Sequence, residues 1–245
     1  MSGTALLALA GLGMAWVWLV APAFIEGESL AAAGKQIAEG GNFSLEILEP
    51  LVAAERPFVL NSPCIGPALQ GKQWIALKLA DLADQEGNNV TRIDANLEQL
   101  ERNVRTTLAC SPYDGFAWLM LYWAHGRRTG FNGEPLDFLA MSYAVAPREG
   151  ALALYRNPKA ILAFGLLPPA LQALVVDEWR LLVQARAYET AAAGLTQIDE
   201  DGRERLLAQR DGIDAIVWAE FALYLYRKGS DLVLPDTKQP QRPWR

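Results

Sequence analysis

The N-terminal residues 4–24 form one uncharged apolar run, which limits how this chain can fold more than any other feature of its sequence. A helix over the run would be roughly 30 Å long at about 1.5 Å per residue, and this length matches the hydrocarbon core of a bilayer. The run therefore predicts a transmembrane anchor within residues 1–25, with membrane contact through residues 4–24. A cleaved signal peptide and a buried N-terminal helix are the two alternatives.

The flanks of the run bear on these alternatives. Ala21-Pro22-Ala23 has the small-x-small pattern of a cleavage site, but no basic residue precedes the run and its apolar core is longer than that of a signal peptide. Trp16 and Trp18 suit the aromatic belt at a membrane surface. Because Glu26 and Glu28 follow the run, we expect a single-pass protein of the inner membrane whose C-terminal domain is periplasmic.

The composition excludes several classes of function. The net charge of −6 provides no basic surface that would bind nucleic acid. With one histidine and two cysteines in 245 residues, the chain lacks the side chains for most metal sites and acid–base constellations. We therefore expect no metal, no cofactor and no nucleic-acid partner.

Apolar residues recur at helical spacing through almost all of the remaining chain, and strand-like alternation is scarce. Residues 67–86 and 91–109 carry such patterns, and Gly87-Asn88-Asn89 separates them. Two further patterns of this kind cover residues 171–183 and 213–225. The predicted fold class is all-α.

An internal sequence repeat refines this prediction. The segment Ala109-Cys-Ser-Pro-Tyr-Asp-Gly-Phe-Ala-Trp118 recurs as Ala144-Val-Ala-Pro-Arg-Glu-Gly-Ala-Leu-Ala153. Proline, acid and glycine keep their offsets, and the two copies are 35 residues apart, from Pro112 to Pro147. A proline-started turn followed by an acidic cap and a new helix is how paired-helix repeats are joined.

Residues 91–155 resemble the tetratricopeptide repeat family, whose period is 34 residues. Pro135, Ser142 and the register of Trp118 depart from the pattern of that family. The resemblance implies a tetratricopeptide-like array of helical hairpins over residues 67–230, and an irregular helical bundle is the alternative. We expect an irregular or helical linker region over residues 26–66 before this domain and a proline-rich tail over residues 231–245 after it.

Candidate catalytic residues are few. His125 closes a predicted helix, where a histidine commonly interacts with the last carbonyls and the helix dipole. Cys64 would need a base to act as a nucleophile, and the chain has a single histidine. The glycine-rich segment 126–133 lacks the lysine and the spacing of a phosphate-binding loop. We therefore expect no enzymatic activity.

One cluster of residue types could bind a ligand, either an anion or a sugar. It combines three aromatic and two basic residues, namely Trp118, Tyr122, Trp123, Arg127 and Arg128. The alternative is a solvated helix end whose two cations complement the helix dipole. The proline-rich tail could bind a partner through Trp244. The alternative is a tail that is disordered or lies over its own domain.

The two cysteines, Cys64 and Cys110, each lie close to a proline at a predicted helix boundary. In the oxidising compartment predicted above, a pair of free thiols would be unusual, so we predict a Cys64–Cys110 disulfide. Two buried, reduced cysteines are the alternative.

Taken with the resemblance, these features predict a membrane-anchored scaffold of the bacterial envelope that binds protein partners through a helical groove. Support of a complex such as one for exopolysaccharide export is the narrower expectation. The alternatives are an accessory subunit whose N-terminal helix docks into a larger inner-membrane complex, helped by small residues such as Gly11 and Ala15, and a glycan-binding module.

Overall fold

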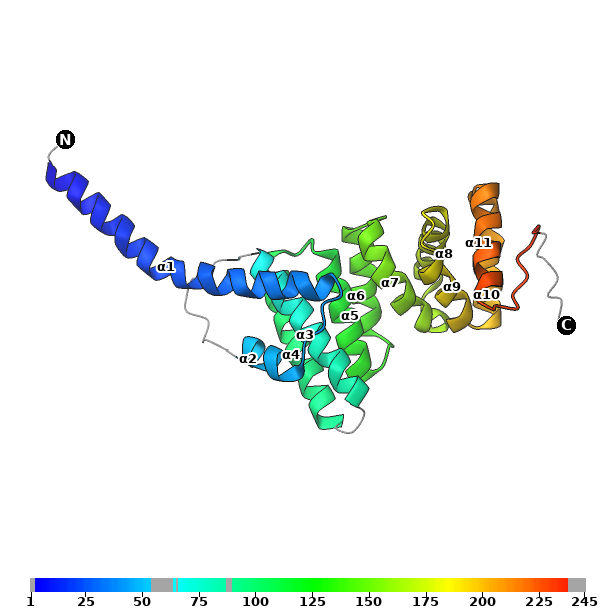
Figure 1. Ribbon diagram of the computed structural model, residues 1–245, viewed down its shortest axis with the longest axis horizontal. Coiled ribbons are helices and arrows are strands. Elements are labelled where there is room, and N and C mark those ends of the chain that lie inside the picture. The colour runs from blue at the N-terminus through cyan, green and yellow to red at the C-terminus, as the bar shows by residue number, and fades with distance from the viewer. Residues whose placement is uncertain (1–2, 54–63, 65, 87–89, 238–245) are drawn as a thin grey trace. The chain divides into compact units, whose positions relative to one another are not determined.

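The computed structural model covers residues 1–245 and describes residues 3–53, 64, 66–86 and 90–237 (Figure 1). All regular secondary structure in these ranges is helical, so the all-α prediction is confirmed. The chain divides into two compact units, Met1–Arg128 and Thr129–Arg245. The boundaries expected near residues 25 and 66 both fall inside the first unit.

The first unit is built around one central helix. Its elements are α1 (Gly3–Ala38), α2 (Leu45–Ala53), α3 (Gly66–Glu86), α4 (Val90–Cys110) and α5 (Gly115–Thr129). Helices α1, α2 and α4 all pack against α3. Leu48, Ile75 and Leu79 form the buried centre of this packing, and Leu30 and Ile37 of α1 lie against it.

The contact between α1 and α3 depends on two glycines. A Cβ atom on Gly71 would overlap the backbone of Leu30, and one on Gly34 would overlap the backbone of Gly71. The two helices therefore approach more closely than residues with side chains at these positions would allow.

Helix α1 corrects the prediction for the N-terminus. It does not end near Phe24 but continues as one helix to Ala38, and glutamate and lysine are compatible with this because both are good helix formers. Its second half belongs to the packed core. In the part of the chain that the structure describes, no helix combines the length and the apolar character that crossing a membrane requires. The predicted single-pass anchor over residues 4–24 is therefore wrong, and so is the inner-membrane location derived from it.

The second unit is a succession of helices. They are α6 (Glu134–Val145), α7 (Gly150–Leu162), η1 (Phe164–Leu166), α8 (Pro169–Gln184), α9 (Tyr188–Gln197), α10 (Glu200–Leu207), η2 (Ala208–Gly212) and α11 (Ala215–Arg227). Helix α8 is central and contacts α7, α9, α10 and α11. Trp179, Trp218 and Phe221 are fully buried here, and the Trp179 indole donates a hydrogen bond to the Ala191 carbonyl at 3.0 Å.

The internal sequence repeat lies at two helix starts. Helix α5 begins at Gly115, the glycine of the first copy, and helix α7 begins at Gly150, the glycine of the second copy. The cap differs between the copies. The Asp114 carboxylate accepts a hydrogen bond from the Ala117 backbone N–H at 2.9 Å, whereas Glu149 makes no side-chain cap. The fold is thus repeat-like in its succession of helices, and its membership in the tetratricopeptide family stays a prediction.

The Cys64–Cys110 disulfide is present, as predicted, with the two Cα atoms 5.7 Å apart. It joins the chain just before α3 to the C-terminal residue of α4. The first residues of the C-terminal tail pack against the second unit. Leu234 is buried, and the Trp218 indole donates to the Pro235 carbonyl at 2.9 Å. Trp244 lies outside the described residues.

Candidate functional site

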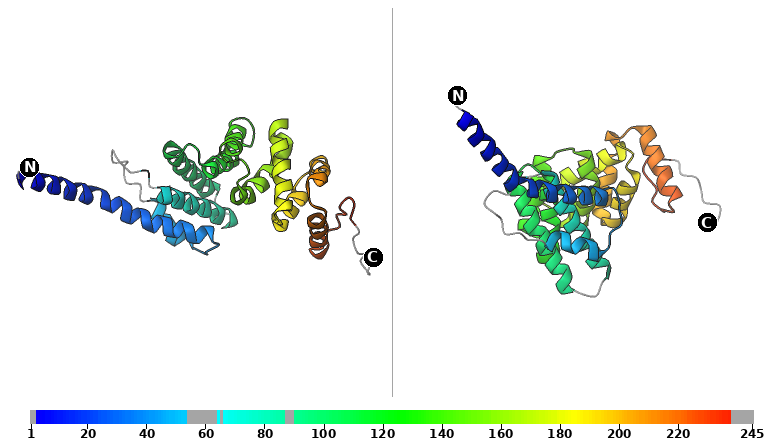
Figure 2. Two further views of the ribbon diagram at one scale, coloured as in Figure 1. Left: turned by 90° about the horizontal axis from the view of Figure 1, so that it is seen from above. Right: turned by 60° about the vertical axis from the view of Figure 1, so that its left-hand side comes forward.

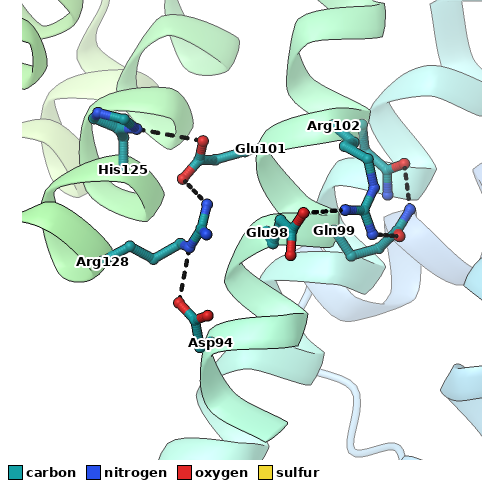
Figure 3. Close-up of polar contacts among 8 residues, drawn as sticks. Asp94, Glu98, Gln99, Glu101, Arg102, His125 and Arg128 are labelled. Atoms are coloured by element: carbon teal, nitrogen blue, oxygen red, sulfur yellow. Dashed lines mark hydrogen bonds and ion pairs between the residues drawn. The ribbon is translucent and has the colours of Figure 1, made fainter. Parts of the chain in front are cut away.

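Two acidic residues of α4 face two basic residues of α5, and Figure 3 shows this group. Asp94 and Glu101 are seven residues apart on α4, and His125 and Arg128 are three apart on α5, so each pair lies on one face of its helix. We call these four residues the α4–α5 clamp.

Glu101 is at the centre of the clamp. Its Oε1 accepts a hydrogen bond from Arg128 Nη1 at 3.0 Å, and its Oε2 lies 3.3 Å from His125 Nδ1. Arg128 Nε donates a second bond, to Asp94 Oδ1 at 2.8 Å. The hydrogen bonds from Arg128 to Asp94 and to Glu101 raise the pKa of the guanidinium above its usual value. Glu101 is buried, and a buried carboxylate requires such partners.

The clamp can hold two helices together, but its chemistry is limited. The Glu101 carboxylate orients the His125 ring, as a carboxylate does in acid–base sites. No cysteine nucleophile is available, because both cysteines form the disulfide. In the described parts of the chain, no three His, Cys, Asp or Glu side chains are grouped to hold a metal ion. The arrangement is that of an electrostatic contact between α4 and α5.

A second polar group in Figure 3 lies along α4 itself. Arg102 Nη1 pairs with Glu98 Oε1 at 2.8 Å, and the same guanidinium donates to Gln99 Oε1. Both members of the ion pair are about half exposed, so solvent screens it. This group stabilises the surface of one helix.

The structure separates the five residues predicted to bind a ligand. Tyr122 is fully buried in the core, and burial raises the pKa of its hydroxyl above the usual value. Arg128 belongs to the clamp. The Trp118 indole donates to the Pro112 carbonyl at 2.8 Å. Trp123 and Arg127 are brought together, with the guanidinium 5.7 Å from the ring centre.

Sequence reasoning placed His125 at a helix end and missed its pairing with Glu101. The available signal was the spacing: acids at positions 94 and 101 of one helix and bases at 125 and 128 of the next. It could not be used from the sequence, because it becomes informative only when the facing sides of α4 and α5 are known.

The second unit contains a buried ion pair that the sequence analysis also missed. Arg156 of α7 is fully buried, and its Nε and Nη2 donate to Glu178 Oε1 of α8 at 3.0 and 2.6 Å. Its Nη1 donates to the Ser142 carbonyl at 2.7 Å, and its guanidinium lies 4.0 Å from the centre of the Tyr143 ring. The Tyr143 hydroxyl donates to Glu178 Oε2 at 2.8 Å. One arginine thus joins α6, α7 and α8.

Burial raises the pKa of Glu178 above its usual value, although the bonds from Arg156 and Tyr143 oppose that shift. Arg156, Glu178, Ser142 and Tyr143 all belong to the second unit. Its geometry is that of a structural ion pair.

Comparisons with protein families, with curated proteins and with solved structures found no match to this chain.

Proposed function

We propose that this protein is a non-enzymatic helical scaffold that binds other proteins. The observation that carries the proposal is the exposed apolar surface on the first half of α1. Trp18 is 85% exposed and Leu19 is 81% exposed, and both are large apolar side chains. Figures 1 and 2 show this half of α1 running clear of α2, α3, α4 and α5.

Soluble monomers rarely present a contiguous apolar patch larger than a few hundred Å², and larger patches mark surfaces where another molecule binds. The buried or partly buried ion pairs described above, Arg128 with Glu101 and Arg156 with Glu178, join neighbouring helices, which suits structural roles. Both features favour a binding protein over an enzyme.

The narrower function that we infer is support of a multiprotein complex, such as one for exopolysaccharide export. It is supported by the loose resemblance of residues 91–155 to repeat proteins that organise complexes. An accessory subunit that docks through α1 into a larger complex would use the same surface. The pairing of Arg127 with the Trp123 ring favours a glycan-binding module as the second candidate.

Site-specific photocrosslinking in the full-length chain tests the scaffold. A photoreactive residue replacing Leu19 should form adducts with protein when the chain is expressed in its own cells. Leu162 of α7 is 68% exposed and serves as the matched control position. Protein adducts from position 19 but not from position 162 are expected. Absence of any protein adduct at position 19, together with saturable glycan binding that Trp123→Ala removes, would instead establish the glycan-binding module.

A further inference from the structure

The chain that follows α11 turns back toward the start of that helix (Figure 1). Residues 230–237, called the docked tail below, have no helix or strand. The Ser230 N–H donates to the Leu225 carbonyl, and the Pro235 carbonyl accepts from the Trp218 indole. Leu225 and Trp218 are seven residues apart, about 10 Å along the helix axis, and five extended residues at about 3.3 Å each are long enough to cover that distance. The docked tail therefore runs antiparallel to α11.

One side chain anchors the docked tail. Leu234 is 1% exposed, whereas Val233 beside it is 69% exposed, and Pro235 and Asp236 are exposed as well. The Thr237 hydroxyl donates to the Leu234 carbonyl at 2.8 Å and closes a turn at this point. A buried side chain for specificity and main-chain hydrogen bonds for affinity are the means by which proteins bind extended peptides.

Two side chains receive the docked tail, Trp218 of α11 and Arg210 of η2, and we call them the tail site. Trp218 is fully buried, and a buried indole N–H requires an acceptor. Here the acceptor is the Pro235 carbonyl, at 2.9 Å. Arg210 Nε lies 3.5 Å from Asp236 Oδ2. The tail site therefore contacts a main-chain carbonyl and the carboxylate of the next residue.

The docked tail fits the tail site imperfectly. Arg210 Nε is buried, and among the described residues it has no hydrogen-bond partner, so its ion pair with Asp236 does not satisfy it. Asp236 also has a φ of 56°, in the left-handed region where a residue with a side chain is uncommon. A peptide whose acid reaches Arg210 without this backbone conformation would fit the tail site better.

We propose that the tail site binds an extended peptide of another protein, in which leucine and proline precede an acidic residue, and that the docked tail occupies the site until such a peptide displaces it. The inference rests on the proposed function and deepens it, since it names a binding surface and the chemistry of its partner. The docked tail itself is the example of what the site accepts. Because it is tethered, it competes with every free peptide, and a partner must bind well enough to overcome this competition.

Fluorescence anisotropy of a labelled peptide with the sequence of residues 230–237 tests the inference on the full-length chain. The wild type should bind this peptide weakly but saturably, because its own tail competes. Leu234→Ala releases the docked tail and should bind the peptide at least about tenfold more tightly. Val233→Ala, a matched change at the exposed neighbour, should bind like the wild type. A peptide with alanine at the position of Leu234 should not bind.

A second pair of variants changes exposed charge and leaves the core untouched. Asp236 is 75% exposed, so Asp236→Arg weakens the docked tail by placing two positive charges together. It should strengthen peptide binding about threefold, as the loss of an exposed ion pair does. Arg210→Glu/Asp236→Arg restores the pair with its charges reversed. The docked tail then returns to the site, and binding of the peptide should fall below that of Asp236→Arg.

Several results would overturn the inference. They are a wild type without saturable peptide binding, equal binding by the wild type, Leu234→Ala and Asp236→Arg, and a charge-reversed pair that binds as tightly as Asp236→Arg. A wild-type dimer that Leu234→Ala dissociates would assign the tail site to a second copy of this chain and also overturn it. The photocrosslinking result is independent, because protein adducts at position 19 uphold the scaffold even where the tail site binds no peptide.

Discussion

At the residue scale, the ion pair between Arg156 and Glu178 makes the sharpest prediction for stability. Both side chains are buried, so removing one leaves the other buried without its main partner. Arg156→Met should lower the free energy of unfolding by about 3–5 kcal/mol, measured by denaturant titration of the full chain. Arg156→Met/Glu178→Leu should recover a large part of that loss, because both charges are then absent.

The exposed pair of Arg102 and Glu98 is the matched control. Arg102→Met should change the free energy of unfolding by no more than about 0.5 kcal/mol, because solvent screens that pair. Equal losses for Arg156→Met and Arg102→Met would contradict the structural role of the buried pair.

At the scale of elements, the packing of α1 on α3 depends on Gly71. Alanine is the better helix former by about 1 kcal/mol, so Gly71→Ala would be stabilising if only the helix mattered. Its Cβ would overlap the Leu30 backbone, however, and α1 would have to move. We therefore expect Gly71→Ala to lower the free energy of unfolding by about 1–3 kcal/mol, as overpacking does.

Gly13→Ala is the control for this prediction, because a Cβ at Gly13 would meet nothing within 4 Å. It should leave stability unchanged or raise it by up to about 1 kcal/mol. If Gly71→Ala raised the free energy of unfolding, helix α1 would not pack on α3 as closely as the structure shows.

At the scale of the whole molecule, the disulfide crosslinks only the first unit. It joins residues 46 positions apart, Cys64 and Cys110. The chain-entropy relation for a loop of that length gives about 4 kcal/mol of stabilisation. After reduction and alkylation, hydrogen–deuterium exchange should become faster in α3 and α4, while α8 and α11 of the second unit stay protected. Alkylation of native, unreduced protein should label neither cysteine, and two labelled thiols would contradict the crosslink.

Much of the local structure follows from the sequence alone. The helical spacing of apolar residues predicts the all-α class, and Gly115 and Gly150, each three residues after a proline, predict the starts of α5 and α7. Helical faces and caps arise from interactions between residues within about four positions of one another, so a sequence window contains the information. The disulfide was predicted from a location that the structure contradicts, and the sequence by itself supplies only the choice of partners, because Cys64 and Cys110 are the two cysteines of the chain.

Tertiary structure decided how these helices are used. Tyr122 and Trp123 are neighbours on α5, yet Tyr122 is fully buried, whereas Trp123 is half-buried and lies against the exposed Arg127. The pairing of Arg156 with Glu178 joins residues 22 positions apart. The sequence of α1 determines that its first half is a long apolar helix, whereas only the fold determines that its second half packs on α3 and leaves the first half exposed. Composition and periodicity determine which faces of a helix are apolar, but the neighbour that covers each face is set by long-range packing.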